Sequence, residues 1–122
     1  MQSFVDLNCW KEAKAFRIAC FNLVSEFPQE EKYRLADQLI RSSRSIGNAI
    51  AEGHGRYHYQ ENIQYCKLAR GSLTESLDHL FIAQECGYLT EKKLKEFEEH
   101  HSRLLALLNG YIKYLIKRRD EK

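Results

Sequence analysis

The chain has 122 residues, of which 43% are hydrophobic and 30% are charged, and its formal net charge is only +2. This composition predicts one globular domain over residues 1–122 and excludes a disordered chain. No apolar run approaches the roughly 20 residues of a membrane span, and the N-terminus lacks the basic start and apolar middle of a signal peptide. We therefore expect a cytoplasmic protein with no membrane association.

The first predicted element is an amphipathic helix from about Asp6 to Phe27, where apolar residues recur at alternating three- and four-residue steps. Asp6 or Asn8 is placed to cap its first amides. Trp10 widens the apolar stripe, so we expect this helix to contact two neighbours.

A second helix is expected from Pro28 to about Glu52, because proline ends the preceding helix and suits the first turn of the next. Gly53 is expected to terminate it in the left-handed conformation. Gly47 lies inside this helix, where glycine costs about 1 kcal/mol relative to alanine. We expect close approach of another backbone to offset that cost.

A third helix is expected to begin at His58 or Tyr59, with Glu61 reaching back to its first amides, and to close at Gly87. Thr90 is expected to cap a fourth helix that extends toward the C-terminus. Because the connections are short, neighbouring helices should run antiparallel. The predicted fold class is all-α, an up-down-up-down four-helix bundle.

The sequence carries few catalytic signals, since it has no phosphate loop, dinucleotide fingerprint or nucleophile elbow. Glu98 and His101 have the i, i+3 spacing of di-iron bundles, but a second Glu-x-x-His pair is missing. We predict no enzyme activity, no metal and no cofactor, with a metal-dependent bundle enzyme as the remote alternative. The four cysteines form no Cys-x-x-Cys pair and are expected to be free thiols.

Basic residues are the candidate nucleic-acid contacts, because lysine and arginine bind phosphates without reading sequence. Some lie on the outward side of the second helix, one follows that helix, and the others cluster near the C-terminus. The predicted contacts are Arg41, Arg44, Arg56, Lys113, Lys117, Arg118 and Arg119. The alternative is an ordinary solvated face with i, i+4 ion pairs.

Some apolar and aromatic residues fall outside the predicted core. Leu68 and Ile82 lie opposite the apolar line of the third helix. Tyr57, Tyr59 and Tyr65 lie near the preceding turn, where tyrosines either stack on bases or pack in an interface. The predicted oligomer-interface residues are Trp10, Tyr57, Tyr59, Leu68 and Ile82.

Several short segments spaced over nearly the whole chain match a known pattern. The clearest are Asp6–Ala13, Phe27-Pro28, Ile50–Gly53, Gly55-Arg56 and Ala69–Ser72. With these segments the chain resembles the four-helix-bundle family encoded in intervening sequences of 23S ribosomal RNA genes. It is also similar to the accessory variability determinants of diversity-generating retroelements.

The resemblance implies a homopentamer of bundles arranged as a barrel, with no established catalytic activity. The retroelement relatives are basic adaptors that bind nucleic acid and a reverse transcriptase. With a net charge of +2 this chain is less basic, which favours the intervening-sequence branch. We therefore expect a non-enzymatic oligomeric module that binds RNA or a ribonucleoprotein, with a protein-protein scaffold or an accessory subunit of a reverse transcriptase as the alternatives.

Overall fold

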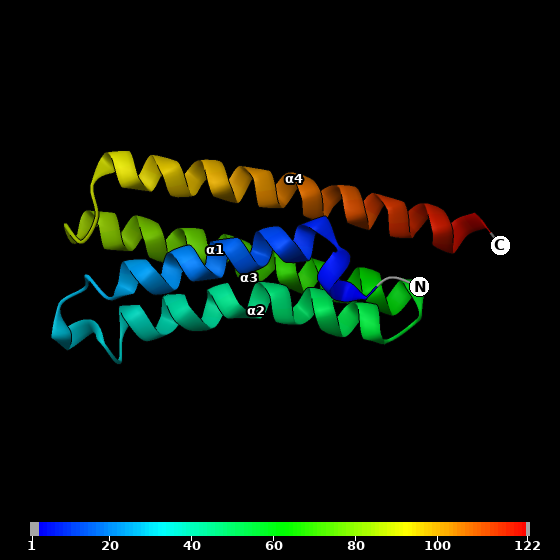
Figure 1. Cartoon of the computed structure of the whole chain (residues 1–122), viewed down its shortest axis with the longest axis horizontal. Coiled ribbons are helices and arrows are strands. Elements are labelled where there is room, and N and C mark those ends of the chain that lie inside the picture. Colours follow the sequence, from blue (N-terminus) through cyan, green and yellow to red (C-terminus); the bar gives the residue numbers. More distant parts are fainter. Residues whose placement is uncertain (1–2, 122) are drawn as a thin grey trace.

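A computed structural model of the chain describes residues 3–121. Four long helices run up and down in one bundle, as predicted (Figure 1). They are α1 (Asn8–Val24), α2 (Leu35–Gly55), α3 (Tyr59–Glu85) and α4 (Glu91–Glu121), with two short 3₁₀ helices, η1 (Phe4–Asp6) and η2 (Gln29–Glu31). The described residues form no strand. No helix within residues 3–121 combines the length and the hydrophobicity that a membrane-spanning segment requires.

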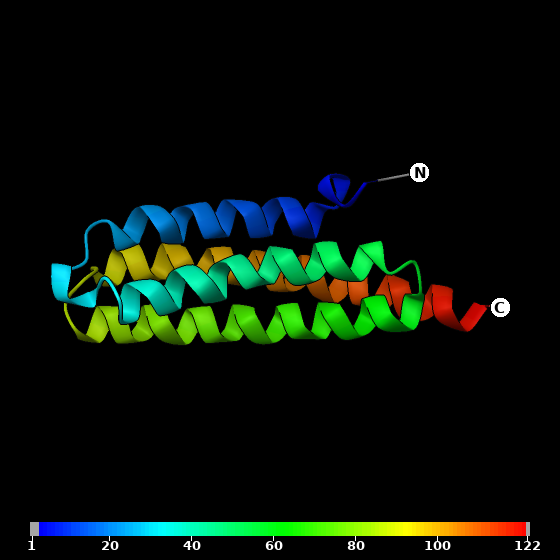
Figure 2. The same cartoon turned by 90° about the horizontal axis from the view of Figure 1, so that it is seen from below.

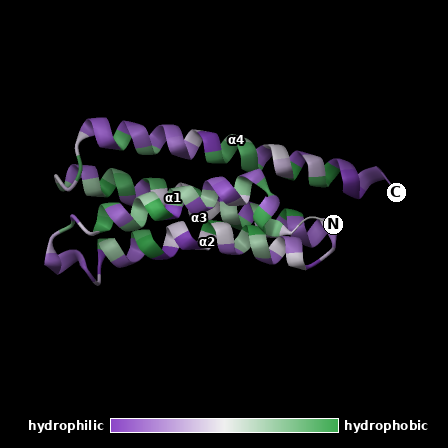
Figure 3. Ribbon diagram, viewed as in Figure 1, coloured by the Kyte–Doolittle hydropathy of each residue, from purple (hydrophilic) through white to green (hydrophobic). Residues whose placement is uncertain are grey.

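The core lies along the axis of the bundle, where the periodic apolar residues of all four helices meet. Phe16 of α1, Leu39 and Ile46 of α2, Leu73 of α3 and Leu104 of α4 are fully buried. Figure 3 shows hydrophobic positions alternating with hydrophilic ones along α4, as expected for a helix that buries one stripe. Figure 2 shows α2 and α3 running side by side over most of their length.

Small polar residues line the seam between α2 and α3. The hydroxyls of Ser42 and Ser76 lie 2.8 Å apart, and those of Ser45 and Ser72 lie 2.9 Å apart. At Gly53 an added Cβ would lie only 2.7 Å from Cβ of Tyr65. The seam therefore depends on small side chains that let the two helices approach closely.

The close backbone approach expected at Gly47 is found elsewhere. An added Cβ at Gly47 would meet the Trp10 indole at 3.5 Å, an ordinary contact with a side chain. Gly53 is the tight position, and it is helical, so its predicted left-handed conformation is wrong. The left-handed residue of this turn is Tyr57, with φ of 62°.

Other predicted helix ends also differ from the structure. α1 ends at Val24 rather than at Phe27, and α2 ends at Gly55 rather than at Glu52. α2 begins at Leu35 rather than at Pro28, because η2 intervenes and Glu31 accepts a hydrogen bond of 3.3 Å from the Leu35 amide.

Neither Asp6 nor Asn8 caps α1, whose N-cap residue is Leu7 without a side-chain cap. Asn8 is the first helical residue, and the Asp6 carboxylate accepts from the Ser3 amide at 3.3 Å and closes η1 instead. Glu61 does not cap α3 but lies 3.9 Å from Arg56.

The connection from α3 to α4 follows the prediction. Gly87 is left-handed, with φ of 83°, and ends α3. The Thr90 hydroxyl accepts a hydrogen bond of 3.1 Å from the Lys93 amide and caps α4. The predicted free thiols are also found: Cys9, Cys20 and Cys66 are buried and Cys86 is exposed, none in a disulfide.

Candidate nucleic-acid interface

The seven predicted phosphate contacts fall into two groups. Arg41 and Arg44 lie in the first half of α2, while Arg56 follows its end, about 20 Å further along at 1.5 Å per residue. The other four are on the last turns of α4. Because the bundle is antiparallel, the end of α4 lies beside the start of α3 (Figure 1). Arg119 donates a hydrogen bond of 2.7 Å to Gln60 across this contact. Five of the seven residues therefore share one end of the bundle, which we call the tyrosine end after the residues described below.

Arg56 is held by a local network. Its guanidinium lies 3.0 Å from Glu52, 3.9 Å from Glu61 and 2.6 Å from the Tyr65 hydroxyl. The hydrogen bond from Arg56 is the main cause that lowers the pKa of the Glu52 carboxyl. Much of the Arg56 charge is thus already matched by carboxylates, and we expect it to shape the turn as much as to attract a phosphate.

Arg118 and Arg119, in the last turn of α4, pack against tyrosines and polar groups. The Arg118 guanidinium lies 5.6 Å from the ring centre of Tyr59 and 5.9 Å from that of Tyr114. It also donates a hydrogen bond of 3.1 Å to the Tyr114 hydroxyl. The Arg118 Nε atom also lies 3.1 Å from the Glu121 carboxylate, so part of its charge is matched within α4. Stacking of this kind orients a guanidinium over the rings.

The remaining predicted contacts are more open. Arg41 pairs with Asp37 at 3.5 Å, and Arg44 lies 5.9 Å from the ring centre of Phe21. Lys113 and Lys117 are exposed. Among residues 3–121 no carboxylate lies within ion-pair distance of these two lysines. Arg44 also has no carboxylate partner among the described residues, but its guanidinium lies over the Phe21 ring.

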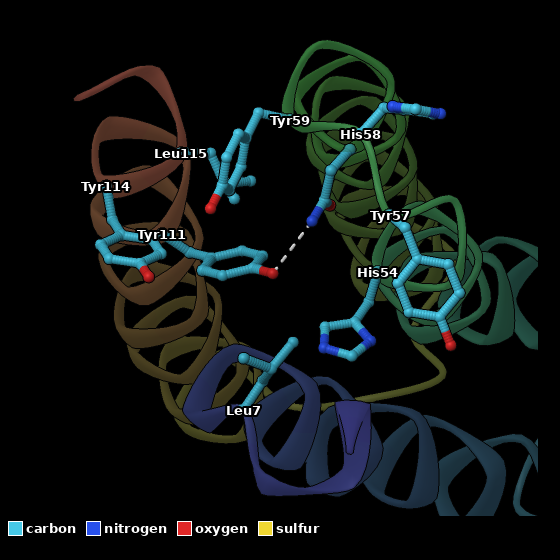
Figure 4. A pocket seen from close by; sticks show the side chains of 9 residues that line it. Leu7, His54, Tyr57, His58, Tyr59, Tyr111, Tyr114 and Leu115 are labelled. Carbon is cyan, nitrogen blue, oxygen red and sulfur yellow. Dashed lines mark hydrogen bonds between the residues drawn. The ribbon is translucent and has the colours of Figure 1, made fainter. Parts of the chain in front are cut away.

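A pocket of about 520 Å³ opens at the tyrosine end, between α4, the turn from α2 to α3 and the start of α1 (Figure 4). Its polar lining consists of Tyr57, Tyr59, Tyr111, Tyr114, His54, His58 and Asn62. Figure 4 shows Tyr111 and His54 pointing into the space above Leu7, while the His58 ring turns away from it.

Asn62 fixes the back of this pocket. Its side chain is almost fully buried and donates a hydrogen bond of 3.1 Å to the Tyr111 hydroxyl. An added Cβ at Gly53 would lie 2.8 Å from the Asn62 side-chain oxygen, so only glycine leaves room for the amide. Burial raises the pKa of Tyr111 to about 12, which keeps its phenol protonated. The Tyr111 and Tyr114 rings are stacked, with centres 6.3 Å apart.

Comparison with known proteins now identifies the family. Residues 5–110 match the family model described as 23S rRNA-intervening sequence protein. The chain belongs to this family. No curated protein is significantly similar to it in sequence.

The fold of this chain is similar to that of a solved structure. That structure is the crystal structure of a protein with unknown function from the S23 ribosomal protein family of Bacteroides thetaiotaomicron. The two align with a TM-score of 0.79 and 22% identity, over 86% of this chain and 95% of that chain. At this identity the likeness establishes the four-helix fold alone.

In this chain, the five residues predicted to form an oligomer interface differ in how exposed they are. The exposed fractions are 76% for Tyr57, 61% for Leu68, 41% for Tyr59 and 38% for Ile82. Trp10 is only partly exposed, because its ring packs edge-on against Phe4, with ring centres 5.3 Å apart, and its indole faces Gly47. Tyr57 and Tyr59 belong to the pocket at the tyrosine end.

Sequence reasoning missed the residues that complete this pocket, which are His54, Asn62, Tyr111 and Tyr114. The signal was available, because an antiparallel bundle must place the end of its fourth helix beside the start of its third. Tyrosines within a few residues of both ends then become neighbours. The cluster is not visible in the periodicity of any one helix, because its tyrosines come from different helices.

A polar contact between α1 and α4 was also not predicted. The His100 Nε2 atom lies 2.6 Å from the Glu12 carboxylate, and the Arg103 guanidinium lies 3.7 Å from the same oxygen. Burial lowers the pKa of His100 and also that of His101. Within residues 3–121 no group of three or more His, Cys, Asp or Glu is arranged to hold a metal.

Proposed function

We propose that this protein is a non-enzymatic, oligomeric module that binds structured RNA or a ribonucleoprotein. The observation that carries the proposal is the gathering of cations at the tyrosine end, where Arg118 and Arg119 of α4 meet the start of α3. Exposed Lys113 and Lys117 extend this basic surface along α4. Such residues neutralise phosphates and position an RNA without selecting its sequence.

The net charge of +2 is too small for one copy to bind RNA tightly, so the proposal includes assembly into a pentameric barrel. Leu68 of α3 is 61% exposed, and Gly71, one turn further on, has open space around it. A glycine inside a helix costs about 1 kcal/mol, and none of residues 3–121 packs against Gly71 closely enough to offset that cost. Close packing of a neighbouring copy against Gly71, with Leu68 covered, would offset this cost. Five copies would then display the basic surface as a ring, and weak contacts would add through avidity.

Light scattering tests the assembly. We expect a single species of five times the 14.4 kDa chain mass, and Leu68→Arg should break it into smaller species. A stable monomer at micromolar concentration would contradict the pentamer.

Fluorescence anisotropy with a labelled RNA hairpin tests the binding. We expect the double variant Lys113→Glu and Lys117→Glu to lose most of its affinity at low salt. The matched control is Lys92→Glu with Lys95→Glu, which makes the same charge change on exposed lysines at the other end of α4. Equal affinities of the two variants would contradict the proposed surface.

A second candidate function is a protein-protein scaffold, which includes an accessory subunit of a reverse transcriptase. The exposed apolar side chains of α1, Ile18 and Phe21, favour it, because they are 43% and 55% exposed on one helix face. Capture of partners from a native lysate, with and without nuclease, separates the two functions. Partners that remain after nuclease treatment support the scaffold, and partners that nuclease releases support RNA binding.

A further inference from the structure

We propose that the pocket at the tyrosine end binds one unpaired nucleobase of an RNA strand, stacked against its tyrosine rings while the arginines of α4 hold the adjacent phosphate. This inference rests on the proposed RNA-binding function and adds a ligand class and a site to it. A base within a duplex is covered by its neighbours, so the site selects single-stranded segments.

The shape and lining of the pocket suit a flat aromatic ligand. Its volume of about 520 Å³ is ample for a nucleotide, and tyrosine rings enter it from both α3 and α4. Tyr59 and Tyr114 are 41% and 49% exposed, so their rings are open to a ligand. Every base has a π-face, and stacking on aromatic side chains is the usual way in which proteins hold unpaired bases.

The charges around the pocket match a base that carries a phosphate. The Arg118 guanidinium lies over two of the lining rings and Arg119 is anchored on Gln60 at the start of α3. Both arginines therefore stand next to the aromatic surface in fixed positions. Each arginine also pairs with a carboxylate of the last turn, Arg118 with Glu121 at 3.1 Å and Arg119 with Asp120 at 2.8 Å, so a phosphate would share these guanidiniums. A purely apolar ligand would use only the rings, whereas a nucleotide uses the rings and the guanidiniums together.

The pocket is built before any ligand arrives. Asn62 is 7% exposed and holds Tyr111 by a hydrogen bond between α3 and α4, and Gly53 leaves the space that this amide needs. A second tyrosine, Tyr57, is held in a left-handed backbone conformation that a bulky residue rarely adopts. The Tyr57 ring is 76% exposed at the pocket rim, so no burial of this ring within the chain compensates for the strained backbone. A base stacked on the ring would supply that compensation.

The test uses a uridine heptamer with 2-aminopurine at its centre, because the fluorescence of this base falls when it stacks on an aromatic ring. An abasic heptamer and a duplex with the same number of phosphates measure binding through phosphates alone. 2-Aminopurine riboside monophosphate tells a free nucleotide from an RNA strand. We expect the heptamer to bind with quenching and to bind more tightly than the abasic strand or the free nucleotide.

The variants are Tyr59→Ala with Tyr114→Ala, and Tyr114→Phe as the conservative change. We expect the double variant to lose the quenching and to bind the heptamer at least about tenfold more weakly. Binding of the abasic strand and of the duplex should weaken much less, since these probes lose only the contacts that orient Arg118. Tyr114→Phe should retain the quenching. The matched control is Tyr33→Ala at the opposite end of the bundle, since that ring is 83% exposed and also has a cation beside it, Lys32 at 5.4 Å.

Each remaining outcome overturns part of the proposal. Equal binding of the intact and abasic strands, without quenching, removes the base site and leaves the proposed RNA binding in place. Equally tight binding of the free nucleotide removes the RNA strand as the ligand. Failure of every probe to bind at low salt removes the proposed function and the base site together. Circular dichroism of the double variant shows whether its helices are intact.

Discussion

The side-chain amide of Asn62 on α3 donates a hydrogen bond of 3.1 Å to the phenol of Tyr111 on α4. These residues are 49 positions apart, and their contact joins the two helices at the end of the bundle where the pocket opens. The Asn62 oxygen also accepts from the Cys66 thiol at 3.6 Å. The amide is thus a buried polar group whose partners all come from the chain itself.

The first prediction concerns this contact. Asn62→Ala should lower the free energy of unfolding by about 1–3 kcal/mol, because it leaves a buried cavity and unpairs the Tyr111 hydroxyl. Tyr111→Phe should cost about 1 kcal/mol. In a double-mutant cycle measured by urea unfolding, the double variant should lose less free energy of unfolding than the sum of the losses in the two single variants. Strict additivity would mean that the two side chains do not interact.

The second prediction contrasts two glycines. Gly53→Ala should destabilise the protein by about 1–3 kcal/mol, because the new methyl group would crowd Tyr65 and Asn62. Gly71→Ala meets open space within the chain and should stabilise the isolated helix by up to about 1 kcal/mol. If Gly71 lies in an interface between copies, the same change should also weaken the oligomer. Thermal melts combined with light scattering measure both effects.

The four cysteines give a third prediction. Burial raises the pKa of the Cys9 thiol to about 11 and those of Cys20 and Cys66 to about 12, whereas Cys86 is exposed. In native protein at neutral pH, a thiol reagent such as dithiobis-nitrobenzoate should modify one thiol quickly. All four should react after denaturation. Fast modification of two or more thiols in the native state would contradict the packing of the core.

The fourth prediction is a loss of stability in mild acid. Burial, the largest cause, lowers the pKa of His100, and Arg103 also lowers it while Glu12 raises it. Burial likewise lowers the pKa of His101. Below about pH 6.5 the two histidines therefore bind more protons in the unfolded chain than in the folded chain. The free energy of unfolding should fall as the pH drops from about 6.5 toward 5.

Urea unfolding at several pH values measures this effect, with the fluorescence of the single tryptophan, Trp10, as the readout. His100→Gln should flatten the profile between pH 7 and 5. A variant of the exposed His58 serves as the control for the loss of one histidine. A wild-type profile that stays flat over this range would contradict the burial of His100 and His101.

Much of the fold was predictable because apolar periodicity reports directly which face of each helix is buried. The positions of Phe16, Leu39 and Leu73 follow from the three- and four-residue steps alone. Local signals also predicted the cap at Thr90 and the left-handed Gly87. These features depend only on residues close in sequence.

The errors arose where a distant residue decides the local conformation. Glycine is the residue that most often ends a helix, but Gly53 is helical. Its missing side chain makes room for Asn62 and Tyr65 of α3. The left-handed turn falls instead on Tyr57, which no propensity favours. The pocket needs Tyr111 beside Asn62, and that pairing follows from topology rather than from any short motif.

The salt dependence of RNA binding tests the central claim most directly. The logarithm of the association constant for a hairpin RNA is measured against the logarithm of the KCl concentration. For wild-type protein we predict a clearly negative slope. In Lys113→Glu with Lys117→Glu the slope should become shallower by roughly one for each phosphate that the variant no longer neutralises. The Lys92→Glu with Lys95→Glu control should keep the wild-type slope. Absence of binding at about 50 mM KCl, where phosphate contacts are strong, or the same slope in all three proteins, would contradict RNA binding through this surface.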